Sequence, residues 1–98
     1  MLTLTLDGKK MTTIEEMHKY LKNALSLSPH YGENLDALWD ELSTKSYPMS
    51  IRIVHTDDME VMLGAYAVKL KELFIEISMY NKAIVVRFDD DEDENEDH

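Results

Sequence analysis

The spacing of hydrophobic residues along this chain predicts three strands separated by helices. Residues 2–6 and residues 49–55 alternate apolar with polar side chains, which is the two-residue period of a strand. In the second of these segments the side chains expected to share one face are Met49, Ile51 and Ile53. Residues 82–88, KAIVVRF, contain a continuous apolar run, which is typical of a strand that is covered on both faces or lies centrally.

The segment between the first two strands has helical spacing. Thr13 and Glu16 match a capping box, and apolar residues then recur at helical spacing, so we expect a helix over residues 14–25. Asn34 is a suitable N-cap for a second helix over residues 35–43. The first connection is therefore expected to contain two helices.

A short and a long helix are predicted between the second and third strands. The short one covers residues 57–63 and ends at Gly64, and the long one covers residues 65–79. The main apolar stripe of the long helix is Tyr66, Leu70, Leu73, Phe74 and Ile77. A second apolar strip consists of Val68, Ile75 and Met79. We expect this strip to pack under the short helix, and a self-association surface is the alternative.

The element order β-α-α-β-α-α-β predicts the fold class. Strands joined by helical crossovers are normally parallel, so we expect an α/β fold with a three-stranded, mainly parallel sheet packed with helices. A length of 98 residues suits one domain, since two cores would each be near the lower limit for independent folding.

Charge is distributed unevenly along the chain. Residues 89–98, DDDEDENEDH, contain eight acidic residues and no Lys or Arg. Subtracting their charge of −8 from the net charge of −10 leaves −2 for residues 1–88. We therefore expect a domain over residues 1–88 and a disordered acidic tail over residues 89–98. This charge disfavours nucleic acid, whose phosphates require Lys and Arg, and favours a basic protein partner.

The amino-acid composition limits the classes of function that this chain can have. The sequence contains no cysteine, which excludes disulfides, thiol catalysis and zinc sites with cysteine ligands. No stretch approaches the roughly 20 apolar residues of a membrane span, and the first residues lack a signal-peptide pattern. We therefore expect a cytoplasmic protein without membrane contact, metal or cofactor. His18 shares the apolar face of the first helix and is expected to pack at the core edge.

Acidic residues without nearby bases distinguish the second predicted helix, in the stretch YGENLDALWDEL. Its apolar face comprises Leu35, Leu38, Trp39 and Leu42. A different face holds Glu33, Asp36, Asp40 and, further round, Glu41. No Lys or Arg occurs between Lys22 and Lys45. A solvated surface and a binding interface both fit, and the adjacent tryptophan favours the interface because aromatic residues typify binding anchors.

Residues 30–40, HYGENLDALWD, resemble the hallmark segment of the barstar family, intracellular inhibitors of a secreted bacterial ribonuclease. The resemblance continues through MHKYLKNAL before this segment and Tyr47-Pro48 after it, and the order of elements over residues 1–88 is similar. It implies a protein inhibitor without enzymatic activity or cofactor. The implied partner is a basic ribonuclease or nuclease toxin, and the free inhibitor is expected to be a monomer.

In that family the second helix and the loop before it plug the active-site cleft of the nuclease. The resemblance implies that Asp40 occupies the position of an RNA phosphate and faces Arg and His side chains of the enzyme. Asp36 would pair with a second basic group. Asn34 and Leu35 would contact the region that recognises guanine, so a guanyl-type ribonuclease is the expected target.

The remaining implied contacts surround this centre. His30 and Tyr31 would supply loop contacts, and Glu76 would add peripheral pairing. Trp39 would support the helix with some edge contact. The chain departs from the family pattern at His30, which is commonly Tyr, and in the loop after the helix, which lacks an aromatic residue and contains Lys45.

Two other functions stay open on the sequence alone. An acidic adaptor with a barstar-like fold but no nuclease target is favoured by His30 and Lys45. An enzyme that uses His30 with the nearby acids lacks support, because the sequence contains no nucleophile–base motif, phosphate loop or compact ligand spacing.

Overall fold

The computed structural model of the chain describes residues 2–89. Its elements in chain order are β1 (Leu2–Asp7), the 3-10 helix η1 (Gly8–Lys10), α1 (Ile14–Ala24), α2 (Leu35–Ser43), β2 (Met49–Val54), α3 (Thr56–Leu63), α4 (Ala65–Tyr80) and β3 (Ile84–Phe88). Apart from η1 this is the predicted order, and α2 has the predicted bounds. Of the predicted acidic tail only Asp89 lies within the described residues, so the domain boundary stays a prediction.

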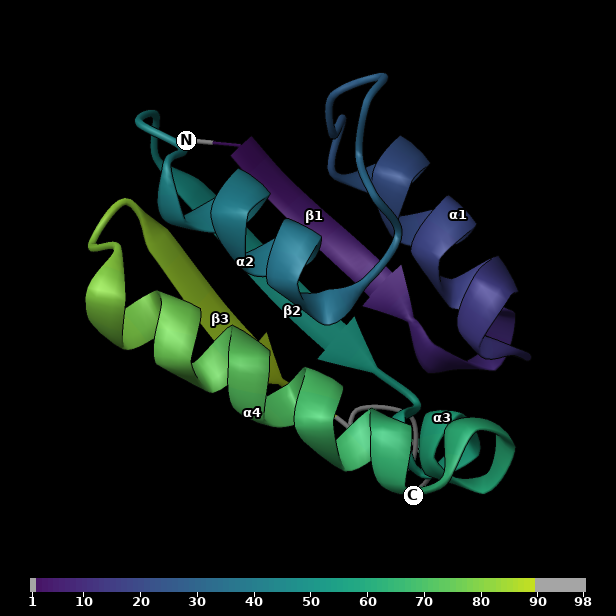
Figure 1. Cartoon of the computed structure of the whole chain (residues 1–98). Coiled ribbons are helices and arrows are strands. Elements are labelled where there is room, and N and C mark those ends of the chain that lie inside the picture. The colour runs from purple at the N-terminus through teal and green to yellow at the C-terminus, as the bar shows by residue number, and fades with distance from the viewer. Residues whose placement is uncertain (1, 90–98) are drawn as a thin grey trace.

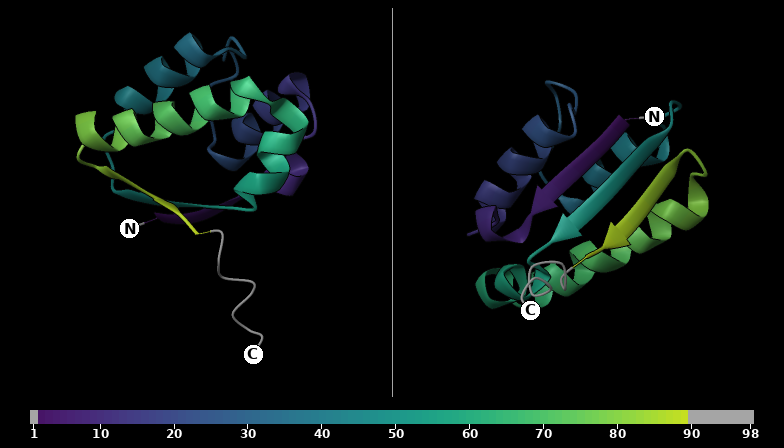
Figure 2. Two further views of the ribbon diagram at one scale, coloured as in Figure 1. Left: turned by 90° about the horizontal axis from the view of Figure 1, so that it is seen from below. Right: turned by 180° about the vertical axis from the view of Figure 1, so that it is seen from behind.

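A parallel sheet with the strand order β1-β2-β3 forms one layer of the molecule. Leu4 pairs with Ile51 and Ile51 with Val86, so these apolar residues form one row across the sheet. Helices α1, α2 and α4 lie on one face of the sheet, while α3 lies beyond the end of β2 (Figure 1). Within residues 2–89 no helix covers the opposite face (Figure 2). The predicted α/β fold with a parallel three-stranded sheet is confirmed.

β3 is an edge strand with one open face, which corrects the expectation that its apolar run is covered on both faces or lies centrally. Ile84 is buried under the helices, whereas Val85 is half exposed on the open face. The prediction was wrong because a valine that faces solvent makes an edge strand look continuously apolar. On the same face Arg52 Nε and Arg87 Nη2 donate to Asp89 Oδ2 at 2.8 and 2.9 Å.

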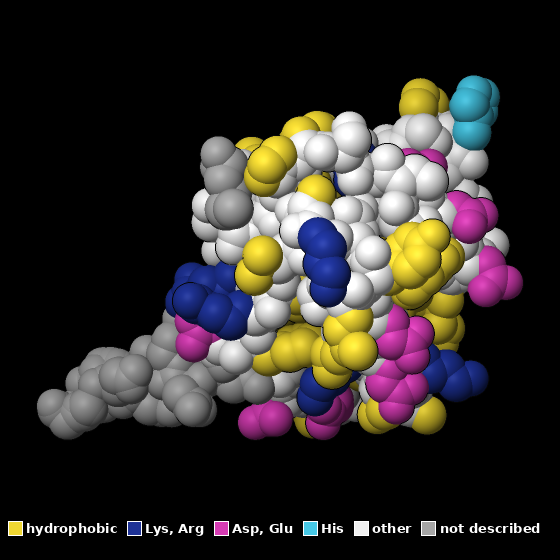
Figure 3. All heavy atoms as spheres, turned by 90° about the vertical axis from the view of Figure 1, so that its left-hand side faces the viewer, with side chains coloured by type: hydrophobic (Ala, Val, Ile, Leu, Met, Phe, Trp, Pro, Cys, Tyr) yellow, Lys and Arg dark blue, Asp and Glu magenta, His cyan; other side chains and the backbone are white. Residues whose placement is uncertain are grey.

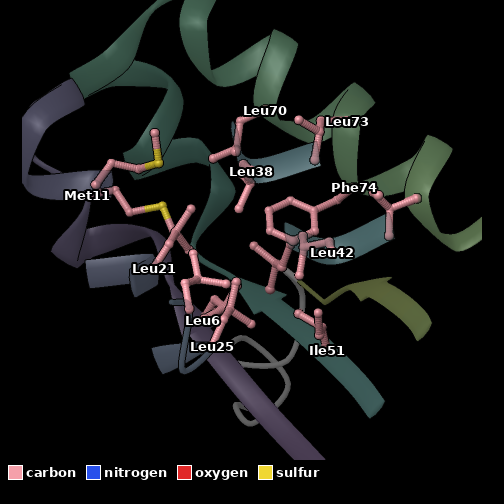
Figure 4. Close-up of a cluster of buried hydrophobic side chains, with 14 of the residues drawn as sticks. Leu6, Met11, Leu21, Leu25, Leu38, Leu42, Ile51, Leu70, Leu73 and Phe74 are labelled. Atoms are coloured by element: carbon pink, nitrogen blue, oxygen red, sulfur yellow. The ribbon is translucent and has the colours of Figure 1, made fainter. Parts of the chain in front are cut away.

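The hydrophobic core lies between the sheet and the helices. Phe74 of α4 and Leu42 of α2 lie side by side over β2, which contributes Ile51 (Figure 4). All three side chains are fully buried, as is Leu38 one turn earlier on α2. Burying a leucine contributes about 1.5–3 kcal/mol, so these contacts fix α2 on the sheet.

The second apolar strip of α4 is exposed, which corrects the expectation that it packs under α3. Val68, Ile75 and Met79 are 49%, 46% and 67% exposed. The short helix instead buries Met59 and packs against η1 and the neighbouring end of α4. Val68 lies two residues from the buried Leu70, about 200° around the helix, and therefore points away from the core.

Candidate functional site

The N-terminus of α2 is fixed by a side-chain cap. Asn34 Oδ1 accepts a hydrogen bond from the Ala37 N–H at 2.8 Å, and Asn34 Nδ2 donates to the Gly32 carbonyl at 3.3 Å. A cap of this kind contributes about 1 kcal/mol and starts the helix at a defined residue. Both polar atoms of the Asn34 side chain are therefore bonded within the chain, although the residue is exposed.

The C-terminus of α2 is held by the end of α4. Asn81 Nδ2 donates to the carbonyls of Leu42 and Lys45, both at 2.9 Å. Thr44 Oγ1 donates to the carbonyl of Asp40 at 3.0 Å. Carbonyls in the last turn of a helix lack partners within the helix, so these bonds stabilise the end of α2 and fix its direction.

The loop that leads into α2 is tied to the helix by Glu41. The N–H and hydroxyl of Ser28 donate to the two oxygens of the Glu41 carboxylate at 3.2 and 2.7 Å. Tyr31 is only 6% exposed, and its N–H donates to the Ser28 carbonyl at 3.0 Å. The loop therefore directs Tyr31, a predicted partner contact, into the protein, whereas His30 beside it is exposed.

Asp36 and Asp40 lie one turn apart on the outer side of α2, and both are exposed. Within residues 2–89, neither carboxylate takes part in an ion pair. Like charges at this spacing cost about 0.2–0.5 kcal/mol in an exposed helix. Glu33 is exposed nearby and has a left-handed backbone with a φ of 57°. The structure thus presents three acids to solvent on α2 and on the loop that leads into it.

A second helix continues this surface. Glu76 is exposed on α4, which packs beside α2. Trp39 and Leu35 are partly buried against the core, and the Trp39 ring contacts the ring of Tyr80 from α4 with 5.4 Å between centroids. Figure 3 looks onto this end of the molecule and shows acidic side chains above and below a hydrophobic cluster along its right-hand side. All the predicted site residues except Tyr31 are thus exposed or only partly buried, and they lie on α2, on the loop before it and on α4.

A comparison with family models adds the deciding observation, because residues 1–91 match the model described as Barstar (barnase inhibitor). The chain belongs to the barstar family. It is also 34% identical over 77 residues to the Bacillus subtilis (strain 168) protein named "Putative ribonuclease inhibitor YrdF". That match covers 78% of this chain and 85% of the relative. The family membership inferred from residues 30–40 is thus confirmed.

A buried histidine connects α1, the loop and α4 in this barstar-family chain. His18 is 1% exposed, deeper than the predicted core edge. Its Nδ1 is hydrogen-bonded to Tyr31 Oη at 2.6 Å and its Nε2 to Tyr66 Oη at 2.9 Å. Burial lowers the pKa of His18, against the opposing influence of Glu33, and raises the pKa of Tyr31 and Tyr66. His18 is therefore a neutral bridge between two uncharged phenols at neutral pH.

Stability is expected to fall on mild acidification because of His18. Its folded-state pKa lies below the unfolded value of about 6.5, so the unfolded chain binds the proton more readily. The contribution of neutral His18 is complete above that unfolded value and is lost as the pH falls through the folded-state pKa. Urea unfolding at a series of pH values between 7.5 and 5 tests this. The variant His18→Gln should flatten the profile, and an equally steep profile would contradict the assignment.

Other polar groups in the described region hold the fold together. His55 Nδ1 is 2.9 Å from Asp7 Oδ1, which also accepts from the Lys9 N–H at 2.9 Å. A Cβ on Gly8 would collide with the His55 carbonyl, so η1 and the start of α3 meet at that glycine. No three His, Asp or Glu side chains within residues 2–89 could hold a metal ion together. None of the helices in that range is long and apolar enough to cross a membrane.

The roles of Glu41, Asn81 and Tyr80 in shaping the site were not predicted from the sequence. Glu41 was grouped with the outward acids, yet it binds Ser28, 13 residues away. Asn81 reaches the end of α2 across 39 residues. Neither pairing has a local sequence signal. Tyr80 does have one, because it follows Glu76 at the spacing that places two side chains side by side on a helix.

Proposed function

We propose that this barstar-family protein inhibits a basic, guanyl-type ribonuclease by placing the acidic face of α2 in the active-site cleft of the enzyme. The observation that carries the proposal is the pair Asp36 and Asp40, which is exposed and takes part in no ion pair within residues 2–89. Two carboxylates on a fixed helix can take the place of RNA phosphates among cationic side chains. The inhibitor needs no cofactor and acts in the cytoplasm as a monomer.

The proposed roles of the site residues follow their positions. Asp40 is the central carboxylate and Asp36 pairs with a second cation, while Glu76 contributes from α4 at the periphery. His30 in the loop, and Asn34 and Leu35 at the start of α2, contact the ribonuclease directly. Trp39 acts mainly as a support, because it is partly buried against the core. Tyr31, which is buried, holds the loop rather than touching the partner.

Titration against a panel of basic microbial ribonucleases, barnase included, tests the proposal directly. RNA cleavage by at least one enzyme should fall to zero at one equivalent of inhibitor. The same titration with the double variant Asp36→Asn, Asp40→Asn should leave cleavage largely intact. Undiminished cleavage by every enzyme in the panel would overturn the proposal.

Association with the inhibited enzyme is expected to slow as salt rises. Exposed charges steer encounter over distances that salt shortens to about 8 Å near 0.15 M, so the association rate constant should fall by about tenfold or more between about 0.05 and 0.5 M NaCl. The dissociation rate constant should change much less. Stopped-flow fluorescence of Trp39, the single tryptophan, provides the measurement. An association rate that ignores salt would argue against cleft insertion.

A second candidate is an acidic adaptor that binds a basic protein other than a nuclease. Lys45 favours it, because this residue lies two positions after the end of α2 and adds a positive charge to the loop there. A basic nuclease would be repelled by that charge. The ribonuclease panel separates the two candidates, since an adaptor leaves every enzyme active.

A further inference from the structure

An aromatic pair joins the acidic face of α2 to α4. The rings of Trp39 and Tyr80 are 5.4 Å apart between centroids, with 46° between their planes. Trp39 is partly buried against the core, but Tyr80 is 67% exposed. Aromatic faces of this kind attract Lys and Arg side chains, and the attraction grows when the contact is removed from water.

Further apolar side chains are exposed on α4 near its C-terminus. Ile75 and Met79 are 46% and 67% exposed and lie at the spacing that makes helix side chains neighbours. Glu76 and Tyr80 have the same spacing and are also exposed. Single exposed apolar residues need no explanation, whereas a contiguous set bordered by charges is typical of a protein–protein interface. The C-terminal part of α4 carries Ile75, Met79 and Tyr80 exposed within six residues, with the exposed Glu76 among them.

We propose that the partner-binding surface extends from α2 across the Trp39–Tyr80 pair onto α4, with Ile75, Met79 and Tyr80 as contact residues. This inference rests on the proposed function. The three residues form the apolar patch of the interface, and the aromatic pair receives a cationic side chain of the nuclease. Asp40 on one side and Glu76 on the other place negative charge around that side chain.

Charge complementarity identifies the occupant as a basic protein rather than a second copy of this chain. Each chain has a net charge of −10. Pairing two copies through this face would bring the exposed acids of α2 and Glu76 close to those of the other copy, and like charges facing each other oppose association. A basic surface removes that repulsion and still covers Ile75 and Met79.

Apolar-to-polar substitutions on α4 test the inference, with barnase and the other ribonucleases of the panel as probes. The double variant Ile75→Ser, Met79→Ser and the single variant Tyr80→Ala should each raise Kd by about tenfold. The increase should come from faster dissociation, with the association rate unchanged, because no charge is removed. Met62→Ser is the matched control, since Met62 is a 55% exposed methionine on α3.

The outcomes separate this inference from the function on which it depends. Weaker binding by the α4 variants, with Met62→Ser unchanged, supports it. If Asp40→Ala weakens binding while all α4 variants bind like the parent protein, the inference is overturned and the proposed function stands. If the parent protein inhibits no enzyme, both are overturned. Sedimentation velocity of the free protein adds one check, because a dimer disrupted by Met79→Ser would assign the patch to a second copy instead.

Discussion

Replacing Asp40 with alanine is expected to weaken binding of the inhibited ribonuclease by more than about 2 kcal/mol, which is roughly thirtyfold in Kd. Asp40 lies in the middle of α2, whose N-terminus is capped by Asn34 and whose C-terminus is held by Asn81 at the end of α4. Its carboxylate can therefore enter a cationic cleft without reordering the helix, so little of its attraction is lost to conformational entropy. Competition kinetics with an RNA substrate give Kd for both proteins.

The same substitution should leave the fold intact. The Asp40 side chain takes part in no ion pair within residues 2–89, and its removal relieves the repulsion from Asp36. We therefore expect a free energy of unfolding equal to that of the parent protein or higher by a few tenths of a kcal/mol. Asp57→Ala is the control, because Asp57 is an exposed acid in the first turn of α3. Unchanged affinity in a normally folded Asp40→Ala protein would refute the site assignment.

Features that depend on local chemistry were predictable from the sequence. The start of α2 was predicted correctly because Asn34 is both the capping residue and the last residue before the helical pattern. The parallel sheet followed from the alternation of strands and helices. The side of β2 that faces the core was predicted from the two-residue period of its apolar residues, and Met49, Ile51 and Ile53 are all buried.

Features that depend on what covers a surface were not predictable in the same way. The run that contains Val85 reads the same whether one or two faces of β3 are covered, because apolar content does not reveal the number of layers. The strip of α4 that contains Met79 was expected to pack under α3 for a similar reason. Glu41 and Asp40 are adjacent acids, yet one binds Ser28 and the other is exposed. Only the path of the loop decides between them.

Replacing Tyr31 with alanine is expected to cost about 3–5 kcal/mol in the free energy of unfolding, as for other buried aromatic residues. This is a large fraction of the about 5–15 kcal/mol that typically stabilises a domain. The substitution opens a cavity under the loop and also removes the hydroxyl that is 2.6 Å from His18 Nδ1. Urea unfolding at neutral pH measures the loss.

The milder variant Tyr31→Phe separates the two roles that this residue could have. It keeps the ring and removes only the hydroxyl, which leaves a buried nitrogen of His18 without its partner and should cost about 1–3 kcal/mol in stability. The affinity of the folded protein for its nuclease should stay within about twofold, because a group that is bonded inside the core adds nothing at the interface. The opposite result, weaker binding at full stability, would place the hydroxyl at the partner surface. Since His30 is exposed beside it, His30→Ala is the matched comparison and should change affinity without changing stability.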